Sequence, residues 1–322
     1  NGFFTRKRIF VFSSLGIIFF SSVGLLISLN EGYKNRFSIP ENISDSFATP
    51  SLADCFDLAN IHTAESWGCK LGQKKEKIDY VLFGDSHSLS FKDLFHQVGM
   101  NEGKQIFFTG ASGCPPLANL IPVREDQMTR NCKKLNDRVQ NFMAQEDIKN
   151  IFLIARWSYY TDGDYDSKNI QYVKSNELNG IDQATSRLVF QNSLRNTLDF
   201  YKSKGINVHL ITQVPSQEID AKDAFFNAYR NHKNVSDISL NKKLYQFSID
   251  RGRHDKLQFY TKSLFKENAS NMNVYDFDNI FCKDKCLIGN SEGSFYSDDN
   301  HLTINGASLV KENIINIFKE LD

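Results

Sequence analysis

Two short motifs contain the residue types that serine enzymes use for acyl transfer. The first, Gly84-Asp85-Ser86, lies between a short apolar run and a helical pattern. A serine at such a strand-to-helix turn has its hydroxyl near the positive end of the helix, where unpaired N–H groups can receive a developing oxyanion. The second, Asp298-x-x-His301, lies near the other end of the chain. Together they predict a nucleophile and its base.

The spacing of the second motif suits a catalytic histidine. An aspartate three positions ahead on one loop can accept the ring Nδ1–H and leave Nε2 facing the serine. We therefore predict Ser86 as the nucleophile, His301 as the general base and Asp298 as the residue that orients His301. Each motif alone has a structural alternative, because Asp85 or Ser86 could merely cap a helix and Asn305 could cap the final one.

A serine nucleophile also needs donors for the oxyanion. The backbone N–H of Ser86 is the first candidate, and that of Ser112 or Gly113 is another. The guanidinium of Arg156, which follows a predicted strand, could supply further donors. A buried ion pair is an equally good reading of Arg156.

Aromatic residues next to Arg156 could contact a sugar. Trp157, Tyr159 and Tyr160 offer ring planes that suit carbohydrate C–H surfaces, although aromatic residues beside a strand often belong to the core. His87 adjoins the nucleophile, but a neighbour one position on rarely has the geometry to take the serine proton.

No motif predicts a metal or a cofactor. The remaining histidines lack the acid or cysteine spacing of a metal site. Three aspartates alternate over residues 162–166, but the spacing of an EF-hand is not met, so we expect a solvated acidic loop.

Strand and helix patterns alternate along most of the chain. Apolar runs predict strands near residues 78–83, 105–109, 150–155, 207–212 and 273–277, and helical spacing predicts helices that include 183–204 and 305–321. This alternation predicts an α/β fold with a parallel sheet covered on both faces, and such sheets place their sites at the carboxyl ends of the strands.

An apolar segment precedes this unit. Residues 9–29 contain no charged residue and are long enough to cross a bilayer, and a basic flank over 1–8 predicts that everything after residue 30 is exported. A cleaved signal peptide is the alternative. Residues 30–75 are predicted to be a linker or extension, followed by a catalytic unit over 76–322. Because the chain begins with Asn1, we expect further sequence upstream.

Six cysteines agree with export. They fall into three neighbouring pairs, which predicts the disulfides Cys55–Cys69, Cys114–Cys132 and Cys282–Cys286 and an oxidising compartment. The last pair also has a spacing near that of zinc ligands, but no second pair lies close in sequence.

Composition restricts the partners. The 322 residues contain 38 lysines and arginines against 38 aspartates and glutamates. A balanced charge without a long basic run excludes the electrostatic footprint of a nucleic-acid binding protein.

The chain resembles the SGNH (GDSL-like) hydrolase superfamily at its two catalytic motifs. More narrowly, four segments resemble SGNH domains fused behind membrane acyltransferase-3 domains, among them bacterial O-antigen O-acetyltransferases: residues 84–88, 112–116, 155–158 and 298–303. The resemblance implies a three-layer α/β/α fold, a serine acyl-enzyme, no cofactor, and an acyl group delivered by an upstream membrane domain. The chain departs from the superfamily after its third strand, where a Gly-x-Asn donor is missing.

These features predict a periplasmic, inner-membrane-tethered O-acyltransferase, most simply an O-acetyltransferase, that modifies a hydroxyl of a cell-surface polysaccharide. A carbohydrate O-acetylesterase would use the same triad with water as the acceptor. A module that only presents polysaccharide is the alternative without catalysis.

Overall fold

A six-stranded sheet forms the centre of the molecule. The computed structural model describes residues 5–29, 39–51, 56–124, 131–230 and 235–321. In sheet order the strands are β1 Cys69–Gly72, β3 Gln105–Gly110, β2 Tyr80–Gly84, β5 Asn150–Ile154, β7 Asn207–Ile211 and β9 Asn273–Tyr275. Five strands are parallel and β1 is antiparallel to β3. The predicted α/β fold is therefore confirmed, with a mixed sheet.

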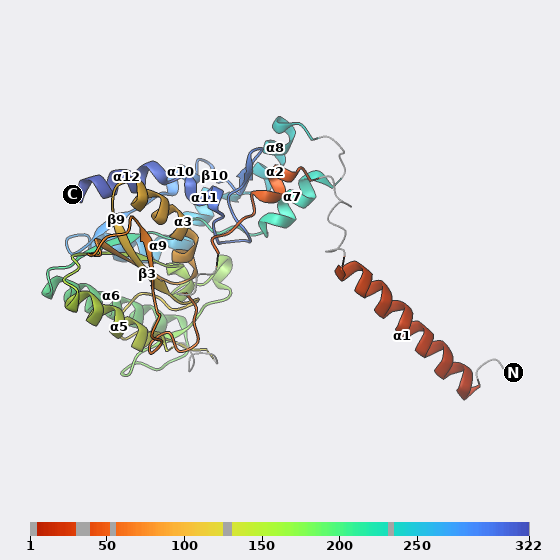
Figure 1. Ribbon diagram of the computed structural model, residues 1–322, viewed down its shortest axis with the longest axis horizontal. Helices are drawn as coiled ribbons and strands as arrows, with labels where there is room; N and C mark the ends of the chain where they lie inside the picture. Colours follow the sequence, from red (N-terminus) through yellow and green to blue (C-terminus); the bar gives the residue numbers. More distant parts are fainter. Residues whose placement is uncertain (1–4, 30–38, 52–55, 125–130, 231–234, 322) are drawn as a thin grey trace.

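Helices cover both faces of the sheet (Figure 1). They are α3 Ser86–Asn101, α11 Ile304–Ser308 and α12 Lys311–Glu320 on one face, and α5 Cys132–Gln145, α6 Gln183–Ser203 and α9 Arg251–Glu267 on the other. Because side chains alternate along a strand, Leu82 and Phe152 belong to the first core and Val81 and Leu153 to the second. This arrangement is the predicted three-layer α/β/α architecture.

Short elements surround the carboxyl edge of the sheet. They are α2 Glu41–Asp45, α7 Ala221–Tyr229, α8 Asp237–Phe247, α10 Asp278–Phe281, the 3-10 turns η2 Trp157–Tyr160 and η3 Tyr165–Ser167, and the two-residue strands β4 Ile121–Pro122, β6 Val173–Lys174, β8 Ile249–Asp250, β10 Lys285–Cys286, β11 Gly289–Asn290 and β12 Gly293–Ser294. Figure 1 shows α2, α7 and α8 together at one end of the folded unit that surrounds the sheet. The rings of Phe47 and Phe225 join α2 to α7, with centroids 5.5 Å apart.

Part of the predicted linker belongs to this fold. Residues 69–72, which we assigned to the extension over 30–75, form the edge strand β1, with Leu71 opposite Ile106. Leu71 is the one residue of β1 that is buried, so a strand this short shows no hydrophobic period. The Ser46 hydroxyl also accepts the Ser294 backbone N–H at 2.8 Å, which ties the extension to the end of the chain.

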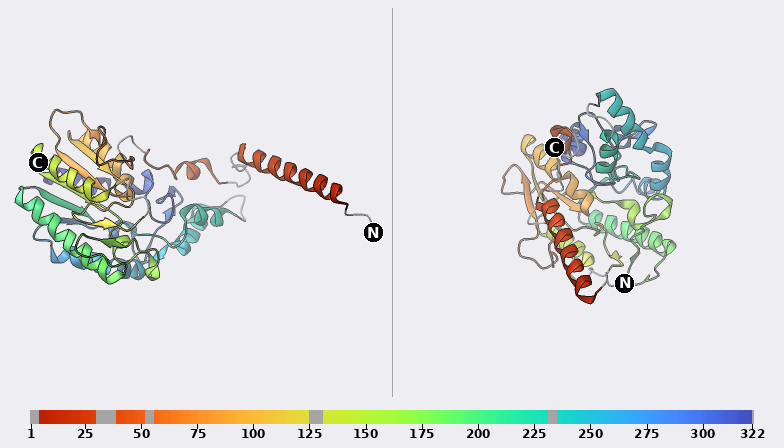
Figure 2. Two further views of the ribbon diagram at one scale, coloured as in Figure 1. Left: turned by 90° about the horizontal axis from the view of Figure 1, so that it is seen from below. Right: turned by 90° about the vertical axis from the view of Figure 1, so that its right-hand side faces the viewer.

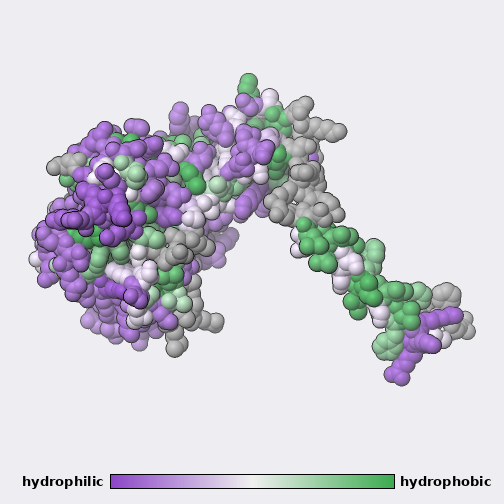
Figure 3. Space-filling model, in the orientation of Figure 1, coloured by the Kyte–Doolittle hydropathy of each residue, from purple (hydrophilic) through white to green (hydrophobic). Residues whose placement is uncertain are grey.

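The apolar segment forms the helix α1, Arg6–Leu29. It is long and apolar enough to cross a membrane, with a mean hydropathy of 2.2 and none of its residues buried. It extends away from the rest of the chain in Figure 1 and in the left view of Figure 2, and Figure 3 shows most of its surface as hydrophobic. A signal sequence, the alternative named above, can meet the same criteria of length and composition.

Two of the three predicted disulfides are present. Cys114–Cys132 joins the loop after β3 to the start of α5, and Cys282–Cys286 closes the turn after α10. The second bond leaves no thiolates for the alternative of a zinc site. Cys69 is also disulfide-bonded, whereas its predicted partner Cys55 lies outside the described residues.

Candidate active site

A tight turn between β2 and α3 presents Ser86. Gly84 is required there because a Cβ atom would overlap the carbonyl oxygen of Ile154 on the neighbouring strand β5. Asp85 is the N-cap of α3 and its carboxylate accepts the backbone N–H of His87 at 2.9 Å. Because Asp85 supplies the cap, the hydroxyl of Ser86 is left for other contacts.

The structure brings the three predicted catalytic side chains into one chain of hydrogen bonds. The Nε2 atom of His301 lies 2.8 Å from the Oγ atom of Ser86, and its Nδ1 atom lies 2.7 Å from Oδ2 of Asp298. The other carboxylate oxygen of Asp298 accepts the backbone N–H groups of Asn300 and His301, each at 2.8 Å. The loop therefore holds both the acid and the ring in position for a relay from Ser86.

The environment of Asp298 keeps its carboxylate ionised. Burial acts to raise the pKa of this carboxyl, but the hydrogen bonds and the charge of His301, with the backbone N–H of Asn300, hold the pKa well below its usual range. An ionised acceptor keeps a proton on Nδ1 of His301 and leaves Nε2 to accept one from Ser86. The side chains of His301 and Asp298 are 31% and 38% exposed, so this relay faces solvent.

His87 contacts the loop that carries Asp298 and His301, here called the histidine loop. Its ring is buried, its Nε2 atom lies 3.0 Å from Oδ1 of Asn300, and its centroid is 5.1 Å from that of His301. Burial, followed by the positive charges of His301 and Arg156, lowers the pKa of His87 well below its usual value. A neutral His87 donates to Asn300 and does not contact Ser86 by any described hydrogen bond. No sequence pattern had indicated this supporting contact.

Asp85 joins the ends of two strands next to Ser86. Its Oδ2 atom accepts the backbone N–H of Arg156 at 3.0 Å and the hydroxyl of Tyr160 at 2.7 Å. Burial raises the pKa of Asp85 despite these donors and that of His87. The three donors fix the turn that carries Ser86.

Two of the three predicted sugar contacts are wrong. Trp157 and Tyr160 are 0% exposed and present no ring face to a ligand. The indole of Trp157 donates to the carbonyl of Ile211 at 2.8 Å and packs in the core, and Tyr160 is occupied by Asp85. Tyr159 is partly exposed beneath the guanidinium of Arg156, 5.1 Å from its centroid, and remains a prediction.

The candidate oxyanion donors differ in the hydrogen-bond acceptors that they already have. The N–H of Ser112 donates to Asp57 at 3.2 Å. The guanidinium of Arg156 pairs with Asp164, as in the ion-pair alternative, while its backbone N–H donates to Asp85 beside Ser86. Gly113 has a φ of 66° and lies beside Ser112. The N–H of Ser86, in the first turn of α3, has no acceptor within the helix and is the donor nearest to the reaction by connectivity.

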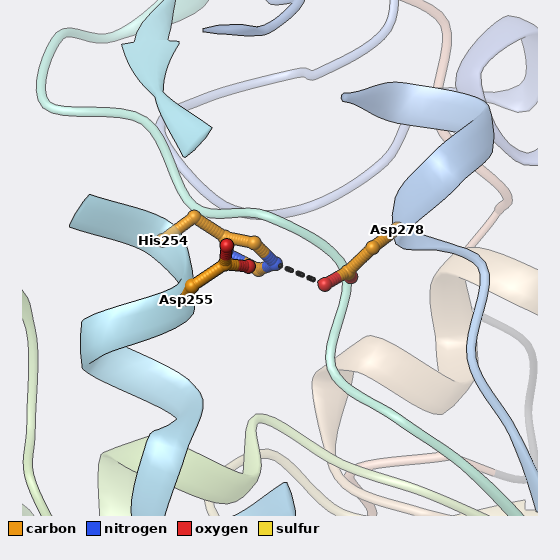
Figure 4. A group of neighbouring side chains, drawn as sticks. All are labelled: His254, Asp255 and Asp278. Atoms are coloured by element: carbon orange, nitrogen blue, oxygen red, sulfur yellow. Dashed lines mark ion pairs between the residues drawn. The ribbon is translucent and has the colours of Figure 1, made fainter. Parts of the chain in front are cut away.

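One group of side chains has the geometry of a metal site. Within the described residues His254, Asp255 and Asp278 place their ligand atoms within 4.8 Å of one another (Figure 4). His254 lies 2.9 Å from Asp278, and the ammonium of Lys262 pairs with the same carboxylate. Burial acts to raise the pKa of Asp278, but His254 and Lys262 lower it to about 2. Lys262 already supplies the cation, so we read the group as a buried ion-pair network between α9 and α10.

The chain is similar to known proteins in sequence and in fold. The family model described as an SGNH domain fused to AT3 domains matches residues 54–316. The solved periplasmic domain of a lipopolysaccharide acetyltransferase from Salmonella ser. Paratyphi A has a TM-score of 0.57 at 18% identity and covers 82% of this chain and 90% of its own. A GDSL-like lipase from Bacteroides thetaiotaomicron has a TM-score of 0.40 at 10% identity, covering 78% and 92%. No curated protein matches the chain.

Proposed function

Because this chain belongs to the family of SGNH domains fused to AT3 domains, we propose that it is an O-acyltransferase, with acetyl as the acyl group. In this proposal Ser86 carries the acyl group and passes it to a hydroxyl of a cell-surface polysaccharide. The observation that carries the proposal is the continuous hydrogen-bond chain from Ser86 through His301 to Asp298. The lipopolysaccharide acetyltransferase that shares this fold supports polysaccharide as the acceptor class.

The geometry supports a two-step transfer. Oγ of Ser86 attacks the acyl carbonyl while Nε2 of His301 takes the hydroxyl proton, and His301 then returns that proton to the departing donor group. A sugar hydroxyl next gives its proton to His301 and attacks the acyl-enzyme ester, which releases Ser86 and restores its proton. The backbone N–H of Ser86 stabilises the oxyanion in both steps.

The N-terminal helix and the disulfides support the periplasm as the compartment of this reaction. The helix α1 would cross the inner membrane and leave the catalytic unit, over 76–322 together with its edge strand β1, in the periplasm. The disulfides suit that oxidising compartment. An AT3 domain that precedes α1 in the sequence would supply the acyl group.

One observation favours an esterase as the second candidate. The side chains of His301 and Asp298 are about one third exposed, so water can reach an acyl-enzyme at Ser86. Water and a sugar hydroxyl would use the same base, and the products alone distinguish them.

The test uses the whole chain in detergent with an aryl acetate and de-O-acylated oligosaccharide from the source cells. Acetylated sugar should increase at the expense of free acetate as the oligosaccharide concentration rises, since a bound hydroxyl has a high effective concentration. Ser86→Ala should lower both products by on the order of 10⁶-fold. The matched control is Ser203→Ala, which removes an exposed hydroxyl at the far end of α6 and should retain parental turnover.

Each result separates the candidates. Rapid release of acetate that ignores the sugar would identify an esterase. Turnover by Ser86→Ala near the parental rate would remove Ser86 from the mechanism.

A further inference from the structure

A polar cleft of about 340 Å³ lies among the loop after β5 and the first turns of α6 and α9. Its volume is at the lower end of the range of about 300–1,000 Å³ that is typical of small-molecule pockets. Charged residues of both signs line it: Asp162, Asp164, Asp166, Arg187, Arg253 and Lys256. None of these residues takes part in the catalytic relay.

The charges of this cleft balance one another. Asp162 pairs with Arg187, and Asp166 lies 3.2 Å from Arg253, while Asp164 pairs with Arg156 behind the cleft. Three lining carboxylates face three lining cations, so the cleft has no net attraction for an anion or a cation. A neutral ligand that both donates and accepts hydrogen bonds suits such a lining.

The lining groups remain accessible to a ligand. The side chains of Arg187 and Arg253 are 39% and 38% exposed and that of Asp166 is 66% exposed. Guanidinium groups offer paired donors in a fixed plane, and carboxylates offer paired acceptors. Adjacent hydroxyls of a sugar ring have the matching arrangement of donors and acceptors.

Hydrogen bonds and an ion pair connect residues of the cleft to the two segments that carry Ser86 and His301. The backbone N–H of Arg156 donates to Asp85, next to the nucleophile, and its guanidinium pairs with Asp164 of the cleft. The hydroxyl of Tyr165, another lining residue, donates to Ser216 at 2.6 Å. The following residue, Gln217, donates its backbone N–H to the carbonyl of Asp299 at 2.6 Å. Residues that line the cleft are therefore bonded, through Arg156 on one side and Ser216 and Gln217 on the other, to the segments that hold Ser86 and His301.

We propose that this cleft binds an uncharged pyranose unit of the acceptor, beside the unit whose hydroxyl is acylated. The proposal rests on the proposed function, because it names the subsite that holds the acceptor of that reaction. The charge balance selects neutral sugars over uronic acids and phosphorylated sugars. The hydrogen-bonding arginines provide most of the affinity.

Binding is measured on the whole chain in detergent, in a Ser86→Ala background that cannot turn over. The probes are neutral oligosaccharide from the de-O-acylated polysaccharide of the source cells and, for comparison, hexagalacturonate. Calorimetry should show that Arg187→Gln and Arg253→Gln each weaken binding of the neutral probe by about tenfold or more, because each removes hydrogen bonds from a charged group. Arg195→Gln is the matched control on α6, exposed and outside the cleft, and should change affinity less than twofold.

Thermal melting separates a lost contact from a lost fold. Arg187 also stacks 4.6 Å from the ring centroid of Tyr260, so its variant can be less stable. Arg253 likewise lies 5.2 Å from the ring centroid of Tyr165, but the carboxylates that it pairs with are exposed, so its variant gives the safer measurement. Unchanged affinity in Arg253→Gln, no binding of the neutral probe by the parent, or tighter binding of hexagalacturonate would overturn the subsite. Failure of the transfer chemistry itself would instead appear as turnover that persists without Ser86.

Discussion

Replacing Asp298 by asparagine should almost abolish turnover while the histidine loop keeps its shape. One oxygen of Asp298 accepts two backbone N–H groups and the other accepts Nδ1–H of His301. The side-chain oxygen of an asparagine can still accept the two N–H groups. Its amide N–H₂ would then face Nδ1 of His301 and require an acceptor there.

The magnitude follows from the tautomer. When Nδ1 of His301 accepts, Nε2 carries the proton and points it at Ser86, 2.8 Å away, so the ring can no longer take a proton from the hydroxyl. The loss of the ionised partner also removes the charge that stabilises a protonated His301. Such a substitution lowers kcat by about 10⁴-fold in serine enzymes with this relay, which corresponds to about 5 kcal/mol of activation free energy.

The assay is aryl acetate hydrolysis by Asp298→Asn in detergent, with thermal melting to show that the fold persists. Asp299→Asn is the matched control, because the same change is made one position along the same loop, on a carboxylate that contacts Asn300 and not His301. This control should lose less than about tenfold, because it lies outside the relay and the asparagine keeps a side-chain oxygen that can accept the amide of Asn300. A variant Asp298→Asn that keeps a tenth of parental kcat/KM, or a control that loses as much, would refute the tautomer argument.

Three further predictions concern stability. Replacing Cys114 and Cys132 by alanine should lower the free energy of unfolding by about 3 kcal/mol in urea titration, because the bridge closes a loop with a sequence separation of 18. The buried carboxyl of Asp278 has a pKa of about 2, below its usual value, so its contribution is present above about pH 4 and is lost as the pH falls through 2. Asp278→Asn should therefore cost about 2 kcal/mol at pH 7, and urea titrations between pH 7 and 2 should show the gap to the parent narrowing below pH 4; a constant gap would contradict the assignment. Tyr160→Phe should cost about 1–3 kcal/mol by calorimetric melting, since it removes a donor from a buried carboxylate, and an unchanged melting temperature would argue against that contact.

The main elements could be predicted because their signals are local. Apolar runs identified the four central parallel strands β2, β3, β5 and β7, because these are buried on both faces of the sheet and need a nearly continuous apolar sequence. The fifth, β9, was identified by a shorter run and lies at the other edge, where none of its residues is buried. Strand β1 had no such signal. It is an edge strand whose backbone pairs with β3, and that partner is supplied by the fold.

The aromatic segment after β5 shows the same limit at the site. Trp157 and Tyr160 follow a strand end, where both a core position and a ligand contact are consistent with the residue types. Their burial was decided by partners far along the chain, the carbonyl of Ile211 and the carboxylate of Asp85. The ion pair of Arg156 with Asp164 likewise depends on how the loop folds back.

The sequence by itself determined the residue types and local spacing of the candidate site. Asp298 and His301 lie on one tight loop, and a serine follows a glycine at a strand end, so their possible chemistry depends on few neighbours. That the two motifs meet, that His87 and Asn300 support the loop, and that the aspartates after β5 form a charge-balanced cleft with residues of α6 and α9 all depend on the folded chain. The physical reason is that side chains distant in sequence acquire their partners, burial and pKa values only when the sheet brings the ends of its strands together.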